Sequence, residues 1–456
     1  MIPLPLDTRR ALGLADDAKS AATVSSCESR SLLLDRYANP EPEEEERSDF
    51  FRSVGRRPAH TDHATSWLRF IQGGLGVPER GLLFAQLQSR HMVNMAGGVM
   101  ENAGLCPDRF SGLPVIPGSA VKGCARRMAI QQLLETREVG KSAQELAGSL
   151  VEIALTFGWG ETDWKAGRKP GKNGRKGELY ADFEFACGEG ESWRAVRDVA
   201  VGSLLKLLGV KHRGHPAEAW KDLPNFAGSA SLLPAWPVKV SAENLPAGAS
   251  PEPGKLELDV VTCHHGQYYK KDPAYAAAPD TEDPVPVVFP AVAAAHVFVF
   301  AVLPLRSCPS ELSAKARTWL AEGLRLFGLG AKTAAGYGWF EDVTPQVVEA
   351  KAKAAANAAA EVSRAAEEEL KEAARSQMAP EQRACDEFLA IARAGKQQEF
   401  AEKARSFAAL DDTARKGFVL ALRAEKDTAK RWKKNKPELI KPWLEFAATM
   451  NPPIPL

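Results

Sequence analysis

A glycine-rich run at residues 328–340 constrains the fold of this chain more than any other stretch. Four glycines stand within eleven residues, and the run directly follows an amphipathic segment predicted to be a helix. Glycine lacks a Cβ and adopts positive φ easily, so consecutive backbone N–H groups of such a loop can approach an anion. A lysine adds charge and a threonine adds a hydroxyl donor. The candidate phosphate-binding residues of this loop are Gly330, Lys332, Thr333, Gly336 and Tyr337.

The spacing of this run differs from that of a nucleotide-binding loop. A Walker loop places Lys-Ser/Thr directly after its last glycine and begins a helix. Here the loop ends a helix and leads into Tyr337, Trp339 and Phe340, an alternation typical of a strand. A nucleotide-binding regulator is therefore disfavoured. The simplest alternative is a helix that ends at a glycine, followed by a tight turn that binds nothing.

A chain of 456 residues, 45% hydrophobic and 26% charged, is long enough for two or three domains with hydrophobic cores. No apolar stretch approaches the roughly 18 residues of a membrane-spanning helix, and residues 1–6 lack the features of a signal peptide. We therefore expect a cytoplasmic protein without membrane contact. Its seven cysteines form no Cys-x-x-Cys pair, which argues against a zinc site or a disulfide framework. Neither a metal nor another cofactor is expected.

A second candidate motif lies at residues 112–127. Pro117-Gly118-Ser119 ends an extended segment there, and a helix capped by Ser119 is predicted over 121–134. Lys122 and Arg126 are four residues apart, so they would share one face near the helix N-terminus, where the helix dipole favours phosphate. The alternative is an ordinary basic helix face in solvent.

Hydrophobic patterns predict alternating strands and helices through the middle of the chain. Strands are expected at 82–90, 178–185, 231–240, 256–262, 285–288 and 295–303, and a further helix at 309–327. The order strand, helix, strands, helix, strand is compatible with a βαββαβ unit. We therefore predict an α+β, ferredoxin-like (RRM-like) fold with large insertions.

A pair of histidines, His264 and His265, begins an excursion from the predicted sheet and is followed by Tyr268 and Tyr269. Metal binding is the weakest interpretation, because adjacent histidines in a strand point to opposite faces. A histidine that titrates near neutral pH would suit acid–base cleavage of RNA. Stacking on exposed bases and a purely structural pair are the other two interpretations.

Two basic segments and one acidic segment divide the charge of the chain. Residues 165–176 carry Lys and Arg without an acid and could follow a phosphate backbone, or be a solvated loop. Residues 426–436 form a second basic segment, which contains Trp432 and could equally be a turn between helices. Glutamates cluster at 41–46.

Four regions are expected from these patterns. They are an irregular N-terminal extension over 1–78 with some helix near 67–71, an RNA-binding domain over 79–345 with a basic insertion near 161–224, an Ala-rich helical spacer over 346–378, and a helical extension over 379–456.

Taken together, these motifs resemble the RAMP superfamily of CRISPR-associated RNA-binding proteins. Four stretches carry the resemblance, in the order typical of the family: 116–123 (IPGSAVKG), 259–269 (DVVTCHHGQYY), 284–289 (PVPVVF) and 331–338 (AKTAAGYG). The resemblance covers about residues 80–343. The basic insertion and the helical extension lie outside it.

The resemblance implies a non-catalytic capping subunit of a type III-B (Cmr) effector complex that acts in antiviral defence. Such a subunit would hold the 3′ region of the CRISPR guide RNA and contribute to target RNA binding. Its partners would be backbone and capping RAMP subunits and the small helical subunit. The RNA-binding residues implied or suggested are Ser119, Lys122, Arg126, His264, His265, Tyr268, Gly330, Lys332, Thr333, Gly336 and Tyr337. The alternative is a metal-independent RAMP endoribonuclease that processes CRISPR RNA with His264 or His265 as its base.

Overall fold

The structure is a computed structural model, and it describes two compact units. The described residues are 7, 10 and 27–455, apart from 96, 101–102, 173, 241–244, 246–251, 270–276, 279–281, 306–307 and 395–396. The first unit comprises residues 1–351 and the second residues 352–456. Part of the predicted excursion after His265 lies outside the described residues.

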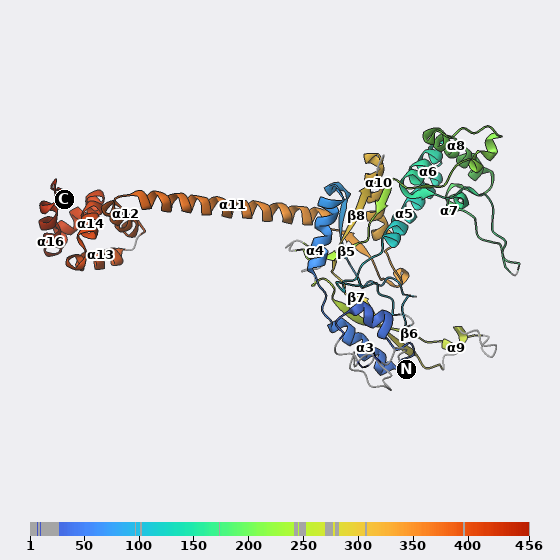
Figure 1. Cartoon of the computed structure of the whole chain (residues 1–456), viewed down its shortest axis with the longest axis horizontal. Coiled ribbons are helices and arrows are strands. Elements are labelled where there is room, and N and C mark those ends of the chain that lie inside the picture. The colour runs from blue at the N-terminus through green and yellow to red at the C-terminus, as the bar shows by residue number, and fades with distance from the viewer. Residues whose placement is uncertain are drawn as a thin grey trace. The chain divides into compact units, whose positions relative to one another are not determined.

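A five-stranded antiparallel sheet forms the centre of the first unit (Figure 1). Its strands are β1 (Leu82–Leu87), β4 (Ala230–Leu232), β5 (Trp236–Val238), β8 (Val297–Pro304) and β9 (Phe340–Asp342). Strand β8 pairs with β1 on one side and with β4 and β5 on the other, while β9 pairs with the free side of β1. The strands expected at 82–90 and 295–303 are thus confirmed, whereas the one expected at 231–240 is divided into β4 and β5.

Two long helices, α5 (Gly118–Glu138) and α10 (Ser310–Leu326), cover one face of this sheet. Alternate residues of β1 point to opposite faces, so Leu83 joins the core beneath α5 and α10, whereas Phe84 joins a second core on the other face. A Cβ at Gly323 of α10 would lie 2.9 Å from the carbonyl oxygen of Cys124 in α5. Glycine is therefore needed for the two helices to approach this closely.

The insertion between α5 and β4 is mainly helical. It contains α6 (Ala143–Phe157), α7 (Asp182–Cys187) and α8 (Glu191–Leu208), with a short pair of strands, β2 (Gly158–Trp159) and β3 (Phe226–Ala227). The strand expected at 178–185 was wrong, since helix α7 begins at Asp182. The buried carboxylate of Glu184 in α7 accepts hydrogen bonds from the backbone N–H groups of Gly167 and Gly190, and these tertiary contacts override the alternating pattern.

The N-terminal region is more helical than the irregular extension that the sequence suggested. Its helices are α2 (Arg30–Leu32), α3 (Glu44–Arg56) and α4 (Asp62–Arg69). Phe50 and Phe51 of α3 are 1% exposed, because the helix packs against a hairpin of the first unit. The glutamates at 44–46 form the first turn of α3, where the helix dipole favours acidic residues.

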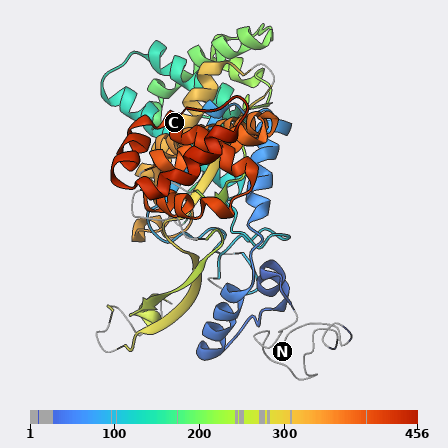
Figure 2. The same ribbon diagram turned by 90° about the vertical axis from the view of Figure 1, so that its left-hand side faces the viewer.

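That hairpin consists of β6 (Leu256–Cys263) and β7 (Val285–Val292), paired in antiparallel register from Leu256↔Val292 to Cys263↔Val285. It projects from the sheet with α3 beside it, as Figure 2 shows. Backbone hydrogen bonds between His91 and Val292 join its base to the residues that follow β1. The short helix α9 (Gly266–Tyr269) follows β6 directly.

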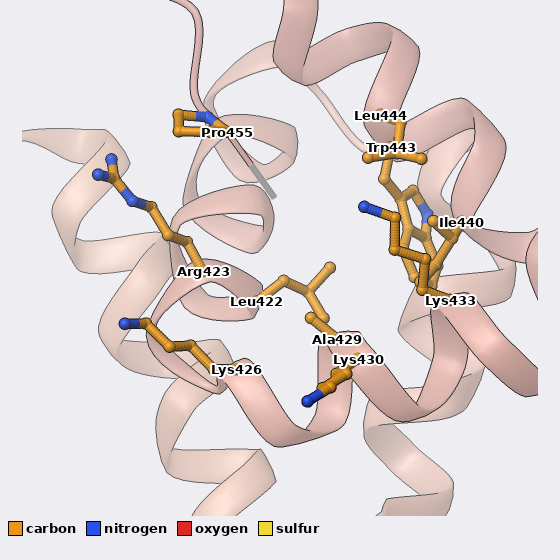
Figure 3. Close-up of a pocket in the computed structure, with 10 residues that line it drawn as sticks. All are labelled: Leu422, Arg423, Lys426, Ala429, Lys430, Lys433, Ile440, Trp443, Leu444 and Pro455. Atoms are coloured by element: carbon orange, nitrogen blue, oxygen red, sulfur yellow. The ribbon is translucent and has the colours of Figure 1, made fainter.

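Helix α11 (Thr344–Gln377) begins in the first unit, and its residues from 351 onward are exposed. This exposure fits the expected Ala-rich spacer, which stays a prediction. The second unit continues with α12 (Pro380–Arg393), α13 (Gln397–Arg405), α14 (Asp412–Ala424), α15 (Lys426–Asn435) and α16 (Pro437–Thr449). The interpretation of 426–436 as a turn was wrong, since most of it is helix α15. The small core of the unit surrounds Phe418 and Trp443, and a hollow beside Trp443 is drawn in Figure 3.

Candidate nucleic-acid interface

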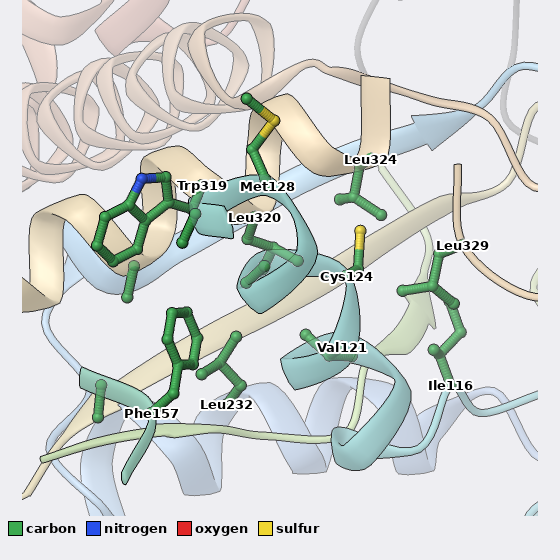
Figure 4. Close-up of a cluster of buried hydrophobic side chains, with 14 of the residues drawn as sticks. Ile116, Val121, Cys124, Met128, Phe157, Leu232, Trp319, Leu320, Leu324 and Leu329 are labelled. Carbon is green, nitrogen blue, oxygen red and sulfur yellow. The ribbon is translucent and has the colours of Figure 1, made fainter. Parts of the chain in front are cut away.

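The N-terminus of α5 lies against the start of the glycine-rich loop, although the two are about 200 residues apart in the sequence. The thiol of Cys124 donates to the carbonyl oxygen of Gly328 (3.8 Å), and the guanidinium carbon of Arg127 lies 4.1 Å from the ring centroid of Phe327. Leu329 joins the buried cluster that contains Val121 (Figure 4). Two of the predicted RNA-contacting motifs are therefore neighbours in the fold.

Ser119 and Lys122 are both exposed at this end of α5. The prediction that Ser119 caps the helix was wrong. The helix begins at Gly118 with Pro117 as its N-cap, because the carbonyl oxygen of Pro117 already accepts from the N–H of Val121 (3.1 Å). Ser119 is thus in the first turn of α5, one turn before Lys122.

Arg126 is engaged within the protein. Its guanidinium group lies 2.9 Å from a carboxylate oxygen of Asp182 and 3.6 Å from one of Asp163, and it stacks over the ring of Phe183 at 4.8 Å. The structure therefore directs Arg126 towards the insertion, whereas Lys122, on the preceding turn, remains exposed. The shared contact of these two cations with one anionic strand stays a prediction.

The glycine-rich loop holds an unusual backbone conformation. Gly328, Gly330, Gly336 and Gly338 all have positive φ, and Lys332 has φ 57°, a left-handed conformation that is uncommon for a residue with a side chain. At Gly330 a Cβ would lie 2.2 Å from the carbonyl oxygen of Met92, so no other residue fits. At Gly336 a Cβ would meet nothing within 4 Å, since the tip of the loop is open to solvent.

Several backbone donors of the loop point into the protein instead of outward. The N–H of Ala331 donates to the carbonyl oxygen of Met92 (2.8 Å), and that of Gly338 to the carbonyl oxygen of Arg90 (2.8 Å). The N–H of Gly336 bonds within the loop, to Thr333 (3.1 Å). These three donors are thus engaged within the protein, and the anion contact expected of the loop stays a prediction.

Lys332 is half-buried, and its ammonium nitrogen lies 4.9 Å from the ring centroid of Phe289 in β7. The negative face of an aromatic ring attracts a cation, and this attraction restricts the position of the ammonium group. The next residue, Thr333, is also half-buried, and its carbonyl oxygen accepts from the indole N–H of Trp339 (3.1 Å). The loop thus holds its lysine and threonine in place beside the hairpin.

A polar network joins the loop to strand β6. The hydroxyl of Tyr337 donates to the carboxylate of Asp259, which also pairs with Arg90 at 2.9 Å, and Arg90 reaches Glu257 at 3.1 Å. Burial alone would raise the pKa of Asp259. Hydrogen bonds from Tyr337 and from the backbone of Val260, together with the charge of Arg90, outweigh burial, so the pKa of Asp259 is lowered. Burial and the hydrogen bond to Asp259 raise the pKa of Tyr337 to about 12. Asp259 is therefore an ionised structural group.

Beneath the loop lies His91, which is 1% exposed and packs edge-on against Phe340. Neither of its ring nitrogens has a hydrogen-bond partner. Burial lowers the pKa of His91 to about 4, so the ring is neutral at physiological pH. A Cβ at Gly330 or at Gly338 would come within 3.4 Å of this ring, so both glycines pack directly against it.

The two histidines of the hairpin lie beyond the end of strand β6, five residues from Asp259. At about 3.3 Å per residue this is roughly 16 Å along the strand, so the pair lies apart from the glycine-rich loop. The ring centroids of His264 and His265 are 6.5 Å apart, with His264 exposed. Tyr268 and Tyr269, both exposed, form an edge-to-face pair at 5.6 Å. Within the described ranges, no group of three or more His, Cys, Asp or Glu could hold a metal.

Sequence reasoning missed four residues that position this surface: Arg90, Asp259, Phe289 and Cys124. Only one signal was available. Glu257 and Asp259 alternate along a strand, which puts two carboxylates on one face and calls for a basic partner. The partner, Arg90, is distant in the sequence and could not be identified from that pattern.

Comparisons with known proteins agree with the resemblance to CRISPR effector RAMP subunits of the type III-B (Cmr) kind. The chain is similar to the CRISPR system Cmr subunit Cmr6 of Pyrococcus furiosus, the sixth subunit, with 27% identity over 252 residues. This match covers 55% of the chain and 64% of that relative, less than two thirds of its length. No family model matches the chain.

Three solved structures also show similarity. The first is a type III-B Cmr-beta complex bound to cognate target RNA. The match covers 66% of this chain and 73% of the chain in that structure, with a TM-score of 0.33 and 16% sequence identity. The second is the crystal structure of Cmr6 from Pyrococcus furiosus. The match covers 57% of this chain and 97% of that chain, with a TM-score of 0.26 and 21% sequence identity. The third is a type IV-B CRISPR complex. The match covers 57% of this chain and 87% of that chain, with a TM-score of 0.25 and 15% sequence identity.

Among the described helices, none is long and apolar enough to cross a membrane.

Proposed function

We propose that this chain is a non-catalytic RNA-binding capping subunit of a type III-B CRISPR effector ribonucleoprotein. It holds the 3′ region of the guide RNA and contributes to target RNA binding in antiviral defence, beside RAMP subunits and the small helical subunit. One observation carries the proposal: the N-terminus of α5, with exposed Ser119 and Lys122, adjoins the loop that holds Lys332 and Thr333. The similarity to Cmr6 supports it.

The order of the elements supports a ferredoxin-like RAMP fold for the first unit. Along the chain the order is β1, α5, the β4–β5 pair, β8, α10 and β9, which is βαββαβ with an insertion after α5. In space β1 and β8 are central, while β9 and the β4–β5 pair are outer. We infer that both candidate motifs belong to one surface of this unit, with the hairpin as a second insertion.

A non-catalytic role is supported by the state of the acidic group nearest the loop. Asp259 is paired with Arg90 and accepts from Tyr337, so it is poorly placed to activate a hydroxyl. The competing endoribonuclease would use His264 or His265 as its base. Incubation of the purified protein with CRISPR repeat RNA separates the two functions. Cleavage that disappears in both His264→Ala and His265→Ala would favour the enzyme, whereas we expect intact RNA.

The salt dependence of RNA binding tests the proposed contacts. Affinity of the full-length protein for a labelled single-stranded RNA should fall linearly on a log–log plot against salt. Each phosphate contact contributes a slope of about 0.7, so Lys332→Ala and Lys122→Ala should each make the slope shallower by about that amount.

The matched control is Lys206→Ala, which removes an exposed lysine from the last turn of α8. It should leave the slope unchanged. Equal slopes for the wild type and all three variants would show that Lys122 and Lys332 make no phosphate contact.

A further inference from the structure

A hollow in the second unit combines an apolar floor with a cationic rim (Figure 3). Its volume is about 420 Å³, within the range of cavities that bind ligands. Leu422, Ile440, Trp443 and Leu444 form most of the floor. The hollow therefore offers apolar contact area large enough for at least one bulky side chain.

Four cations surround this floor, and no residue that lines it is acidic. Lys426, Lys430 and Lys433 follow one another at i, i+4 and i+7 along α15, and Arg423 joins them from the end of α14. Like charges four residues apart repel each other on a helix surface. Lys426 and Lys430 of α15 are such a pair, and an anionic ligand beside them would offset this repulsion.

The indole of Trp443 is the second, independent observation. The side chain is 1% exposed, and its Nε1 has no hydrogen-bond acceptor. A buried donor without a hydrogen-bond acceptor is destabilising. Trp443 lines the hollow, so a small shift of its indole would bring this donor to an oxygen of a bound ligand.

We propose that this hollow binds an acidic amphipathic segment of a partner protein. One large apolar side chain of the segment occupies the floor, its carboxylates contact the lysine row, and one of its oxygens accepts from Trp443. Charge complementarity selects the partner, and the apolar anchor supplies most of the affinity. The site goes beyond the proposed RNA-binding function and does not depend on it.

The burial of the aromatic rings favours a protein segment over a nucleic acid. Single-stranded nucleic acids gain much of their affinity by stacking bases on exposed aromatic faces. Trp443 is 1% exposed and Trp432, on the same helix as the lysines, is 8% exposed, so neither offers such a face. A mainly aliphatic floor suits a leucine-like side chain better than a base.

The test uses the full-length protein and a fluorescent helical peptide that carries glutamates at i, i+4 and i+7 beside one leucine. Fluorescence anisotropy gives the dissociation constant. Lys426→Glu and Lys430→Glu should each weaken binding at least tenfold, and replacement of the peptide leucine by serine should do the same. The matched control is Lys434→Glu, an equal charge change at an exposed residue of α15 that does not line the hollow, and it should stay within twofold.

Trp443→Phe keeps the buried ring and removes only the donor. This variant should bind the peptide a few-fold more weakly. In the wild type, the NMR resonance of the Trp443 indole N–H, which the variant lacks, should shift when the peptide is added. Equal binding by Lys430→Glu and Lys434→Glu, or by the leucine and serine peptides, would overturn the proposal. The proposal would also be overturned if single-stranded RNA displaced the peptide and if this RNA binding were lost in Lys430→Glu but kept in Lys434→Glu.

Discussion

The hydroxyl of Tyr337 donates a hydrogen bond to the carboxylate of Asp259, and this contact fastens the glycine-rich loop to strand β6. The two residues come from separate motifs, 78 positions apart. Because Asp259 also pairs with Arg90, one carboxylate joins the loop, the hairpin and the segment after β1. The surface proposed to meet RNA is thus assembled around a structural ion pair.

Tyr337→Phe should loosen this connection. A hydrogen bond to a charged group is worth about 1.5–3 kcal/mol when buried, and partial exposure of Asp259 reduces this to about 1 kcal/mol. Hydrogen exchange of the β6 amides should become several-fold faster. Tyr269→Phe, at a residue of α9 that is 69% exposed, is the control and should change nothing. Unchanged β6 exchange in Tyr337→Phe would show that the contact does not hold the loop.

His91 should make the first unit sensitive to mild acid. Its pKa is about 4 when folded and 6.5 when exposed, so below pH 6.5 the unfolded chain binds a proton that the folded chain does not. Stability is therefore full above pH 6.5 and is lost as the pH falls towards 4. The loss is about 2 kcal/mol between pH 7.5 and 5.

Thermal unfolding of the wild type and of His91→Leu at several pH values measures this effect. The variant should lose less stability on acidification. Burial also lowers the pKa of His296, whereas a hydrogen bond to Asp222 raises that of His212, so the difference between the two proteins is the relevant quantity. Parallel pH curves would mean that His91 does not titrate as expected.

Two glycines of the loop should respond differently to alanine. At Gly330 the new Cβ would meet the carbonyl oxygen of Met92 at 2.2 Å, in addition to the strain of φ +108°. At Gly336 only the strain of φ +92° remains, about 1 kcal/mol. Gly330→Ala should therefore lower the melting temperature clearly more than Gly336→Ala and should reduce RNA binding. Equal effects would contradict the close approach at Gly330.

Arg126→Ala should release the insertion instead of changing the RNA contacts. The lost ion pairs with Asp182 and Asp163 and the lost stacking on Phe183 should speed proteolytic cleavage between residues 165 and 189. The salt slope of RNA binding should stay as in the wild type. A slope shallower by about 0.7 would instead show that Arg126 meets a phosphate.

Segments with a clear hydrophobic pattern were predictable from the sequence. The nearly continuous apolar run at 295–303 matches β8, which is buried on both faces, and the amphipathic pattern at 309–327 matches α10 within a residue at each end. The pattern at 178–185 failed, although it alternates clearly. There the buried carboxylate of Glu184 binds two backbone N–H groups, a tertiary interaction that no local pattern reveals.

The candidate site was predictable only in part. The glycine-rich sequence indicated a loop with an unusual backbone, and the positive φ angles of its glycines and of Lys332 confirm this conformation. The inward direction of the loop donors depends on the carbonyl oxygens of Arg90 and Met92, which are about 240 residues away. The engagement of Arg126 depends on carboxylates of the insertion. Such long-range partners become visible only once the chain is folded.

The most direct test is to express the tagged chain with its genomic neighbours, isolate it, sequence the bound RNA and identify the co-purifying proteins by mass spectrometry. The proposed function predicts CRISPR guide RNA together with other RAMP subunits. Recovery of the chain alone and free of RNA, when its neighbours are expressed, would contradict it.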